Sequence, residues 1–286
     1  MERTTAGWWS GLAGVIIFSG SLPATRVAVS DFSPLFLTSA RATIAALLGG
    51  ALLLLLRQRR PGRSDLVPLL IVSLGVVIGF PLLTALALRH VSAAHSLVFI
   101  GLLPLSTALF GVLRGGERPR PAFWLFSAIG AAIVAGFAIA SGQGGTLTGD
   151  LLMLASVIAC GLGYAEGAGL SRRLGGWQVI SWALLLSLPP MALIGLFSLP
   201  DSWSGIAASS WFSLGYVSLF SMLIGFLFWY RGLAIGGIAA VGQLQLLQPF
   251  FGLLLAAVLL HEAVAWSMVA CATAVILCVA GAKRFC

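Results

Sequence analysis

The sequence predicts an all-α membrane protein with ten transmembrane helices, arranged as two inverted five-helix repeats around a central cavity. Three observations favour this fold class. Hydrophobic residues make up 59% of the chain and charged residues only 8%, whereas soluble domains carry roughly 25% charged residues. The apolar residues fall into stretches of transmembrane length, and the pattern of the first half recurs in the second half.

Each apolar stretch is long enough to cross the hydrocarbon core, which needs roughly 20 apolar residues in a helix. The connections are short and contain Gly, Pro or Ser, so no soluble domain fits between them. The first stretch is longer than the core of a secretory signal and lacks a convincing cleavage site, so we interpret it as a retained helix. The predicted spans are residues 7–29, 34–56, 66–88, 92–113, 121–141, 148–170, 177–199, 209–231, 238–260 and 264–283.

A proline and a glutamate mark the repeat. Pro104 and Glu117, near the end of the fourth span, recur 145 residues later as Pro249 and Glu262, near the end of the ninth. Both glutamates lie at span ends, outside the expected cavity, so we assign them to loop capping or to gate contacts.

The position of the repeat divides the chain into residues 1–145 and 146–286, with five predicted spans in each part. Because five is odd, the second part must enter the membrane from the opposite side. The result is an inverted-topology repeat related by a pseudo-two-fold axis in the membrane plane. Two such halves can exchange conformations and open a central cavity to one side and then to the other. An alternating-access carrier needs this arrangement.

The distribution of Lys and Arg sets the orientation, because cytoplasmic loops carry an excess of these residues. With the N-terminus in the cytoplasm, all basic residues except Arg26, Arg41 and Arg89 face that side. We therefore predict a multi-pass membrane protein with both termini cytoplasmic. The basic residues are scattered through short loops, so nucleic acid is not an expected partner. The four cysteines lie in predicted spans or at the C-terminus and indicate no disulfide framework.

Several short patterns occur in one order along the whole chain. Arg26 lies late in the first span, the second span carries Ser39-Ala40-Arg41, and Ala87–Ala94 links spans three and four. With the doubled Pro…Glu pattern, they resemble the EamA-type ten-helix branch of the drug/metabolite transporter superfamily. Within that branch the chain looks most like the YddG-type exporters of aromatic amino acids. The resemblance implies an inner-membrane carrier that exports amino acids, metabolites or toxic compounds.

The ninth span holds the richest set of polar residues predicted within the membrane, where such residues are functional candidates. At 100° per residue, Gln245 and Gln248 lie about 60° apart on one helix face, whereas Gln243 points away. The two can form a hydrogen-bonding ladder for a zwitterionic substrate, or they can join helices to one another. The equivalent residues of the first repeat, Ile100 and Leu103, are apolar. Such a lopsided site suits an amphipathic ligand.

Glu166 and Arg41 are charged residues inside predicted spans. Glu166, near the cytoplasmic end of the sixth span, can relay a proton, but we expect it to pair with Arg172 or Arg173. Arg41 lies in the outer part of the second span, not far from Asp31. We interpret it as a snorkelling or paired arginine rather than as a residue that captures a substrate carboxylate.

The remaining candidates are at the outer mouth and along a possible aromatic wall. His95 and Ser96 lie in the first turn of the fourth span, where His95 can contact substrate or titrate near neutral pH; we favour a capping or interfacial role. As a set, aromatic residues of spans three, four, six and eight fit an aromatic-walled cavity, although each alone is expected to pack. They are Phe80, Phe99, Tyr164, Phe226, Trp229 and Tyr230.

Glycines four residues apart form a further pattern, which is typical of helices that approach one another closely. The pairs are Gly7/Gly11, Gly163/Gly167 and Gly232/Gly236.

These observations predict a secondary transporter that exports amphipathic small molecules, in particular aromatic or apolar amino acids, by alternating access. The chain has no G-x-x-x-x-G-K-[ST] motif for nucleotide binding. One alternative is an exchanger of phosphorylated metabolites or nucleotide sugars, which needs a midplane Lys or Arg that the fourth and ninth spans lack. A remote alternative is an intramembrane enzyme, which needs clustered catalytic groups. We expect no enzyme activity, no cofactor and no metal. The expected partners are a small-molecule substrate and the lipid bilayer, with the protein a monomer or weak homodimer.

Overall fold

The computed structural model describes residues 2–91, 96, 99–141, 146–248, 250–252, 254–255 and 266–286, and within these ranges it contains helices and no strands. The elements of the first half are α1 (Glu2–Ser19), α2 (Ser21–Ala28), α3 (Pro34–Leu55), α4 (Arg63–Val72), η1 (Ser73–Gly79), α5 (Phe80–Ala87), α7 (Leu103–Gly115) and α8 (Pro121–Ser141). Those of the second half are α9 (Leu147–Leu174), α10 (Gly176–Phe197), α11 (Ala208–Tyr216), η2 (Val217–Ile224), α12 (Gly225–Gly236), α13 (Ile238–Gly242), η3 (Gln243–Leu247) and α15 (Trp266–Arg284).

Six segments of the described chain are long and apolar enough to cross a membrane. They are Thr4–Ala28, Pro34–Leu55, Arg63–Ala87, Leu147–Leu174, Gly176–Phe197 and Ala208–Gly236. Shorter apolar helices cover Leu103–Gly115 and Pro121–Gly136. The helical character is thus confirmed for the described residues, and these segments are consistent with a membrane protein. The count of ten spans stays a prediction because part of the ninth falls outside the described residues.

Local sequence explains where several helices begin and break. Ser33 precedes α3 and its Oγ accepts a hydrogen bond from the backbone N–H of Phe36 at 3.1 Å, while Pro34 fills the first helical position. The predicted first span is divided in two near Gly20, because Pro23 cannot donate a backbone hydrogen bond to the turn before it. Gly237 separates α12 from α13, and its φ of +93° is a backbone angle that residues other than glycine rarely adopt.

Two long segments contain a stretch of π-helix that the hydropathy pattern did not predict. The segment α4–η1–α5 is π-helical over Ser73–Gly79, and α11–η2–α12 is π-helical over Val217–Ile224. Each π-helical turn adds a residue to the backbone ring and shifts the side chains that follow it. Such segments are frequent at functional sites.

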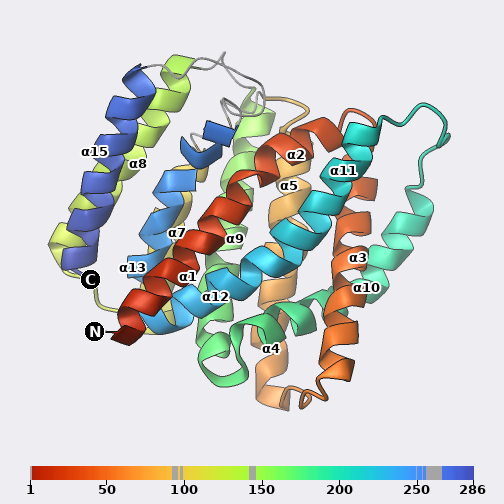
Figure 1. Cartoon of the computed structure of the whole chain (residues 1–286), viewed down its shortest axis with the longest axis horizontal. Helices are drawn as coiled ribbons and strands as arrows, with labels where there is room; N and C mark the ends of the chain where they lie inside the picture. Colours follow the sequence, from red (N-terminus) through yellow and green to blue (C-terminus); the bar gives the residue numbers. More distant parts are fainter. Residues whose placement is uncertain are drawn as a thin grey trace.

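The helices pack as antiparallel pairs that join the two halves. In Figure 1, α8 and α15 lie side by side at one edge of the bundle, and α3 runs beside α10 at the other. Glycines make one crossing especially close. A Cβ added to Gly232 of α12 would lie 2.7 Å from the backbone N of Gly11 in α1, and one added to Gly7 would lie 2.7 Å from that of Gly236. This confirms the close approach predicted for these two glycine pairs.

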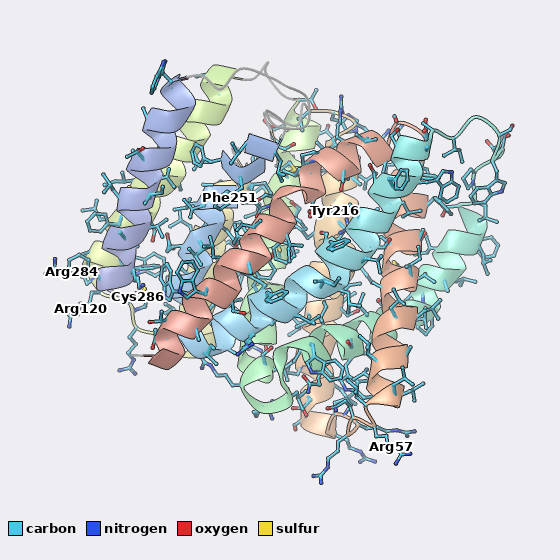
Figure 2. The ribbon with its side chains drawn as sticks, in the orientation of Figure 1. Arg57, Arg120, Tyr216, Phe251, Arg284 and Cys286 are labelled. Atoms are coloured by element: carbon cyan, nitrogen blue, oxygen red, sulfur yellow. The ribbon has the colours of Figure 1, made fainter. Side chains whose placement is uncertain are left out.

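Both chain ends lie at the same end of the bundle (Figure 1). Arg57, Arg120 and Arg284 lie at this end as well, whereas Tyr216 and Phe251 lie away from it (Figure 2). We refer to it below as the basic end. The concentration of cations there agrees with the charge asymmetry of the sequence.

Candidate substrate cavity

A small cavity lies between the two halves of the bundle. The space open to the centre of a water-sized sphere is about 40 Å³, and one water needs roughly 10–15 Å³ on this measure. The cavity in this conformation therefore holds a few waters and must widen to admit an amino acid. Its walls are formed by Phe18, Ser21, Leu22, Thr25, Arg41, Val76, Phe80, Pro81, Thr84, Leu103, Tyr164, Ser221, Met222, Phe226 and Gln248.

Arg41 is the charged residue of this wall. It projects from α3, is only 6% exposed, and donates one hydrogen bond from Nη2 to Ser221 Oγ at 3.2 Å. Its Nε is buried and has no hydrogen-bond partner in the described part of the chain. Within the same ranges no carboxylate forms a salt bridge with it, because Asp31 is directed elsewhere and accepts hydrogen bonds from Ser210 Oγ and the backbone N–H of Ala207. The expected snorkelling or pairing with Asp31 was wrong.

Hydroxyl groups from three elements surround this guanidinium. Ser21 of α2 donates from its Oγ to Ser221 Oγ at 2.6 Å, so Ser221 accepts from both Ser21 and Arg41. Thr84 of α5 also lines the cavity, and its buried Oγ1 has no hydrogen-bond partner among the described residues. This side of the cavity therefore offers the guanidinium and hydroxyl groups as hydrogen-bond donors.

One of the three glutamines lines the cavity, and a second contacts a wall residue. Gln248 lines the cavity and donates from Nε2 to the carbonyl oxygen of Phe18 at 3.3 Å, while Gln245 donates to the hydroxyl of Tyr164 at 3.3 Å. Gln248 therefore lines the cavity, whereas Gln245 contacts a wall residue without lining the cavity itself. Residues Gln243–Leu247 form a 3₁₀-helix, in which side chains three apart eclipse one another.

Aromatic side chains form one wall of the cavity and pack on one another. Phe226 packs on Phe18 with ring centroids 4.9 Å apart and on Tyr164 at 6.0 Å. Trp229 packs behind them, 5.4 Å from Tyr164 and fully buried. The cavity thus combines a polar side around Arg41 with an aromatic side around Tyr164 and Phe226.

Comparison with known proteins identifies the family. Residues 5–139 and 147–282 each match the model of the EamA-like transporter family. The chain belongs to this family. It is 69% identical over 285 residues to a Bacillus subtilis (strain 168) protein named "Uncharacterized transporter YdeK", with 100% of this chain and 99% of that protein covered.

A Streptantibioticus cattleyicolor protein named "Probable terminal-alkyne amino-acid exporter" is 25% identical over 260 residues, which cover 89% of this chain and 85% of that protein. A solved crystal structure superposes with a TM-score of 0.80 over 98% of this chain and 97% of its own, at 22% identity, and so shares the fold. As an EamA-family member, this protein is a membrane transporter.

The structure places the other predicted site residues of this EamA-family chain in different surroundings. Ser96 is buried, and Phe99 is half-buried against the hydrophobic core rather than on the cavity wall. Gln243 is fully buried, and neither its amide oxygen nor its nitrogen has a partner among the described residues. Trp229 supports the wall from behind, and His95 lies outside the described residues.

Ion pairs join helix ends of the transporter on the side of Tyr164 away from Arg41. Glu166 pairs with Arg114 of α7, so the expected pairing with Arg172 or Arg173 was wrong. Arg173 pairs instead with Asp65 of α4 at 2.8 Å. All of these contacts link α9 to first-half helices near the basic end.

Glu117 caps a helix of the opposite half, which confirms its predicted capping role. Its two carboxylate oxygens accept hydrogen bonds from the backbone N–H groups of Ile238 at 2.6 Å and Ala239 at 2.7 Å, at the start of α13. Arg172 lies 3.6 Å from the same carboxylate. The counterpart glutamate, Glu262, and the proline Pro249 lie outside the described residues.

Sequence reasoning missed the polar residues that accompany Arg41, namely Ser21, Thr25, Thr84 and Ser221. Hydroxyl residues are common in membrane helices because they can bond to their own backbone, as Ser218 does with the carbonyl of Leu214. Composition therefore does not distinguish a hydroxyl in a cavity from one in a helix interface.

Proposed function

We propose that this transporter is a secondary carrier that exports amino acids with aromatic or apolar side chains, and related small metabolites, across the bacterial inner membrane by alternating access. The observation that carries this proposal is an amphipathic cavity whose walls are built from equivalent positions of two halves. The family supports a transporter, and the cavity supports the substrate class.

The cavity walls support the inverted-repeat arrangement. Six of the lining residues form pairs related by the 145-residue spacing of the sequence, each with one member in each half. The pairs are Val76 with Ser221, Pro81 with Phe226, and Leu103 with Gln248. A cavity on a pseudo-two-fold axis is expected to be lined in this way, because the axis brings equivalent positions together.

The backbone supports the same arrangement. Shifted by 145 residues, positions 72–79 correspond to 217–224, and π-helix occupies Ser73–Gly79 and Val217–Ile224. Helices α3 and α10 occupy equivalent places in the two halves and pack against each other, and so do α8 and α15. Two separate matches to the family model, one in each half, agree with these correspondences.

The contents of the cavity support an amphipathic substrate. Arg41 and Gln248 offer polar contacts, while Phe18, Phe80 and Phe226 offer an apolar surface. A relative is named as an amino-acid exporter, and an amino acid with an apolar side chain has both features. The phosphorylated-metabolite alternative gains one cation from Arg41, but a phosphate dianion is usually held by several cationic or backbone donors.

The location of the chain ends supports the orientation. Both ends and the labelled arginines share the basic end of the bundle, so we place this end in the cytoplasm by the positive-inside rule. The ion pairs of Glu166 and Arg173 then lie on the cytoplasmic side. We retain a monomer or weak homodimer as the expected assembly.

Counterflow in liposomes tests the proposal. Purified protein is reconstituted into vesicles loaded with one unlabelled compound, and entry of the labelled compound is followed for a panel of amino acids and for glucose 6-phosphate. We expect exchange of phenylalanine, leucine or a related amino acid. Exchange of the sugar phosphate alone would refute the proposal.

A matched pair of glutamine variants connects transport to the cavity. Gln248→Leu introduces the residue found at the equivalent position of the first half, Leu103, and we expect exchange to fall at least tenfold. Gln58→Leu alters a glutamine that bonds to Gln178 far from the cavity and is expected to leave exchange unchanged. Equal rates in the two variants would remove Gln248 from the site.

A further inference from the structure

We propose that Arg41 binds the carboxylate group of the transported molecule, so that a free carboxylate is required of every substrate. The inference deepens the proposed function and rests on it, because it assigns one chemical group of the substrate to one residue of the cavity. The inference predicts that amino acids and other organic acids bind, whereas their amides and the corresponding amines do not.

The first argument is the uncompensated charge of Arg41. An ionised side chain within a membrane protein normally pairs with an opposite charge or faces a water-filled cavity. Arg41 is 6% exposed, lines the cavity, and has no salt bridge to the described residues. Its one hydrogen bond goes to a neutral hydroxyl, and its Nε–H has no acceptor. An anion in the cavity would supply the missing partner.

The second argument is the direction of the neighbouring hydrogen bonds. Ser221 Oγ accepts from Arg41 and from Ser21, which occupies both of its lone pairs. Its own hydroxyl proton is then left to donate. The hydroxyl of Thr84 on the same wall is also without a partner among the described residues. A carboxylate accepts several hydrogen bonds and donates none, so it can accept from the Arg41 guanidinium and from these two hydroxyls.

The third argument is the arrangement of the rest of the cavity. Gln248 and Tyr164 provide neutral polar groups, and Phe18 and Phe226 provide an apolar surface. A carboxylate at Arg41 therefore leaves the apolar body of a substrate against the aromatic rings. An arginine and a carboxylate form two parallel hydrogen bonds, which fixes the orientation of the substrate as well as its charge.

The stability of ligand-free variants provides the first test. Removing a buried charge that has no partner relieves a desolvation cost, whereas removing one partner of a buried ion pair leaves the other charge uncompensated and is strongly destabilising. We expect Arg41→Met to melt at or above the wild-type temperature in detergent. The control is Arg26→Met, which alters an exposed arginine that binds the backbone carbonyl of Leu88 at 2.7 Å. An Arg41→Met protein that melts well below both others would assign Arg41 a structural role and overturn the inference.

Binding provides the second test, with 3-phenylpropionate and its neutral isostere 3-phenylpropanamide as probes. Heat stabilisation of the purified protein is measured against probe concentration. We expect the acid to stabilise the wild type and Arg26→Met, and the amide to have no effect. In Arg41→Met the half-saturating concentration of the acid should rise about 100-fold, and in Arg41→Lys about tenfold, because lysine keeps the charge but loses the planar fork.

Two results would overturn the carboxylate site. Equal stabilisation of the wild type by acid and amide would show that the charge is not recognised. Stabilisation by phenyl phosphate without stabilisation by 3-phenylpropionate would assign Arg41 to a different anion.

The design separates failure of this inference from failure of the proposed function. If no amino acid exchanges in liposomes while Arg41-dependent stabilisation by the acid persists, the proposed function fails and the carboxylate site stands. If phenylalanine exchanges at the wild-type rate in Arg41→Met, the proposed function stands and the carboxylate site fails.

Discussion

The crossing of α1 and α12 allows a quantitative prediction about packing. Gly232 of α12 faces Gly11 of α1 across the junction between the two halves. The substitution Gly232→Ala places a Cβ 2.7 Å from the backbone N and 2.8 Å from the Cα of Gly11. Ordinary contacts begin near 3.4 Å, and the opposing atoms are backbone, so the helices themselves must separate.

Two opposing effects set the size of the change. Alanine favours a helix over glycine by about 1 kcal/mol, whereas overpacking a tight interface costs about 1–3 kcal/mol. The net expectation for Gly232→Ala is a loss of up to about 2 kcal/mol. Gly169→Ala in α9 is the matched control, because its Cβ meets nothing within 4 Å. That variant should gain up to about 1 kcal/mol. Because the helix-propensity gain is common to both variants, they should differ by the overpacking cost, about 1–3 kcal/mol.

This difference is measured by equilibrium unfolding in mixed micelles. The fraction of denaturing detergent is increased, and unfolding is followed by tryptophan fluorescence. We expect the midpoint to fall for Gly232→Ala and to stay or rise for Gly169→Ala. Equal midpoints for the two variants would refute the close crossing of α1 and α12.

Further predictions concern polar groups at helix ends. Glu117→Gln should lower the free energy of unfolding by about 2 kcal/mol, because the carboxylate accepts hydrogen bonds from two backbone N–H groups at the start of α13. In the same unfolding assay Glu166→Gln should cost less than about 1 kcal/mol, because it loses only an ion pair to a half-exposed arginine. Hydrogen bonds from Ser210 and the backbone of Ala207 hold the pKa of Asp31 below its usual 3.8, so the stabilisation by its carboxylate is present above about pH 4 and is lost as the pH falls. The difference in melting temperature between wild type and Asp31→Asn should therefore shrink on acidification, and a difference that grows below pH 4 would contradict this assignment.

Much of the architecture follows from the sequence because a membrane imposes simple rules on it. The predicted span 34–56 agrees with α3 (Pro34–Leu55) to one residue, since a capping serine and a proline fix its start. The breaks in other spans were not predicted. Hydropathy averages over many residues, so it cannot distinguish an α-helix from the π-helix of Ser73–Gly79 or the 3₁₀-helix of Gln243–Leu247.

The candidate site was predicted less well, because it depends on which side of each helix faces inward. Helix α3 is apolar on nearly all sides, so its sequence does not indicate that Arg41 turns toward the cavity. Glu166 was expected to pair along its own helix, but packing brings Arg114 of α7 to it instead. Tyr164, Phe80 and Gln248 line the cavity, and their binding of substrate stays a prediction.

Alternating access by two inverted halves is tested most directly by thiol labelling from each side of the membrane. Thr25, on the cavity wall, and Leu170, buried in α9, are related by the 145-residue spacing. Cysteine is introduced singly at each position in a protein whose four native cysteines are replaced, and a membrane-impermeant maleimide is applied to whole cells and to inside-out vesicles.

The account predicts that Thr25→Cys reacts from the outside and Leu170→Cys from the cytoplasmic side. Saturating phenylalanine on one side should raise labelling at one position and lower it at the other. Labelling of both positions from the same side, or a parallel rise at both, would contradict the account.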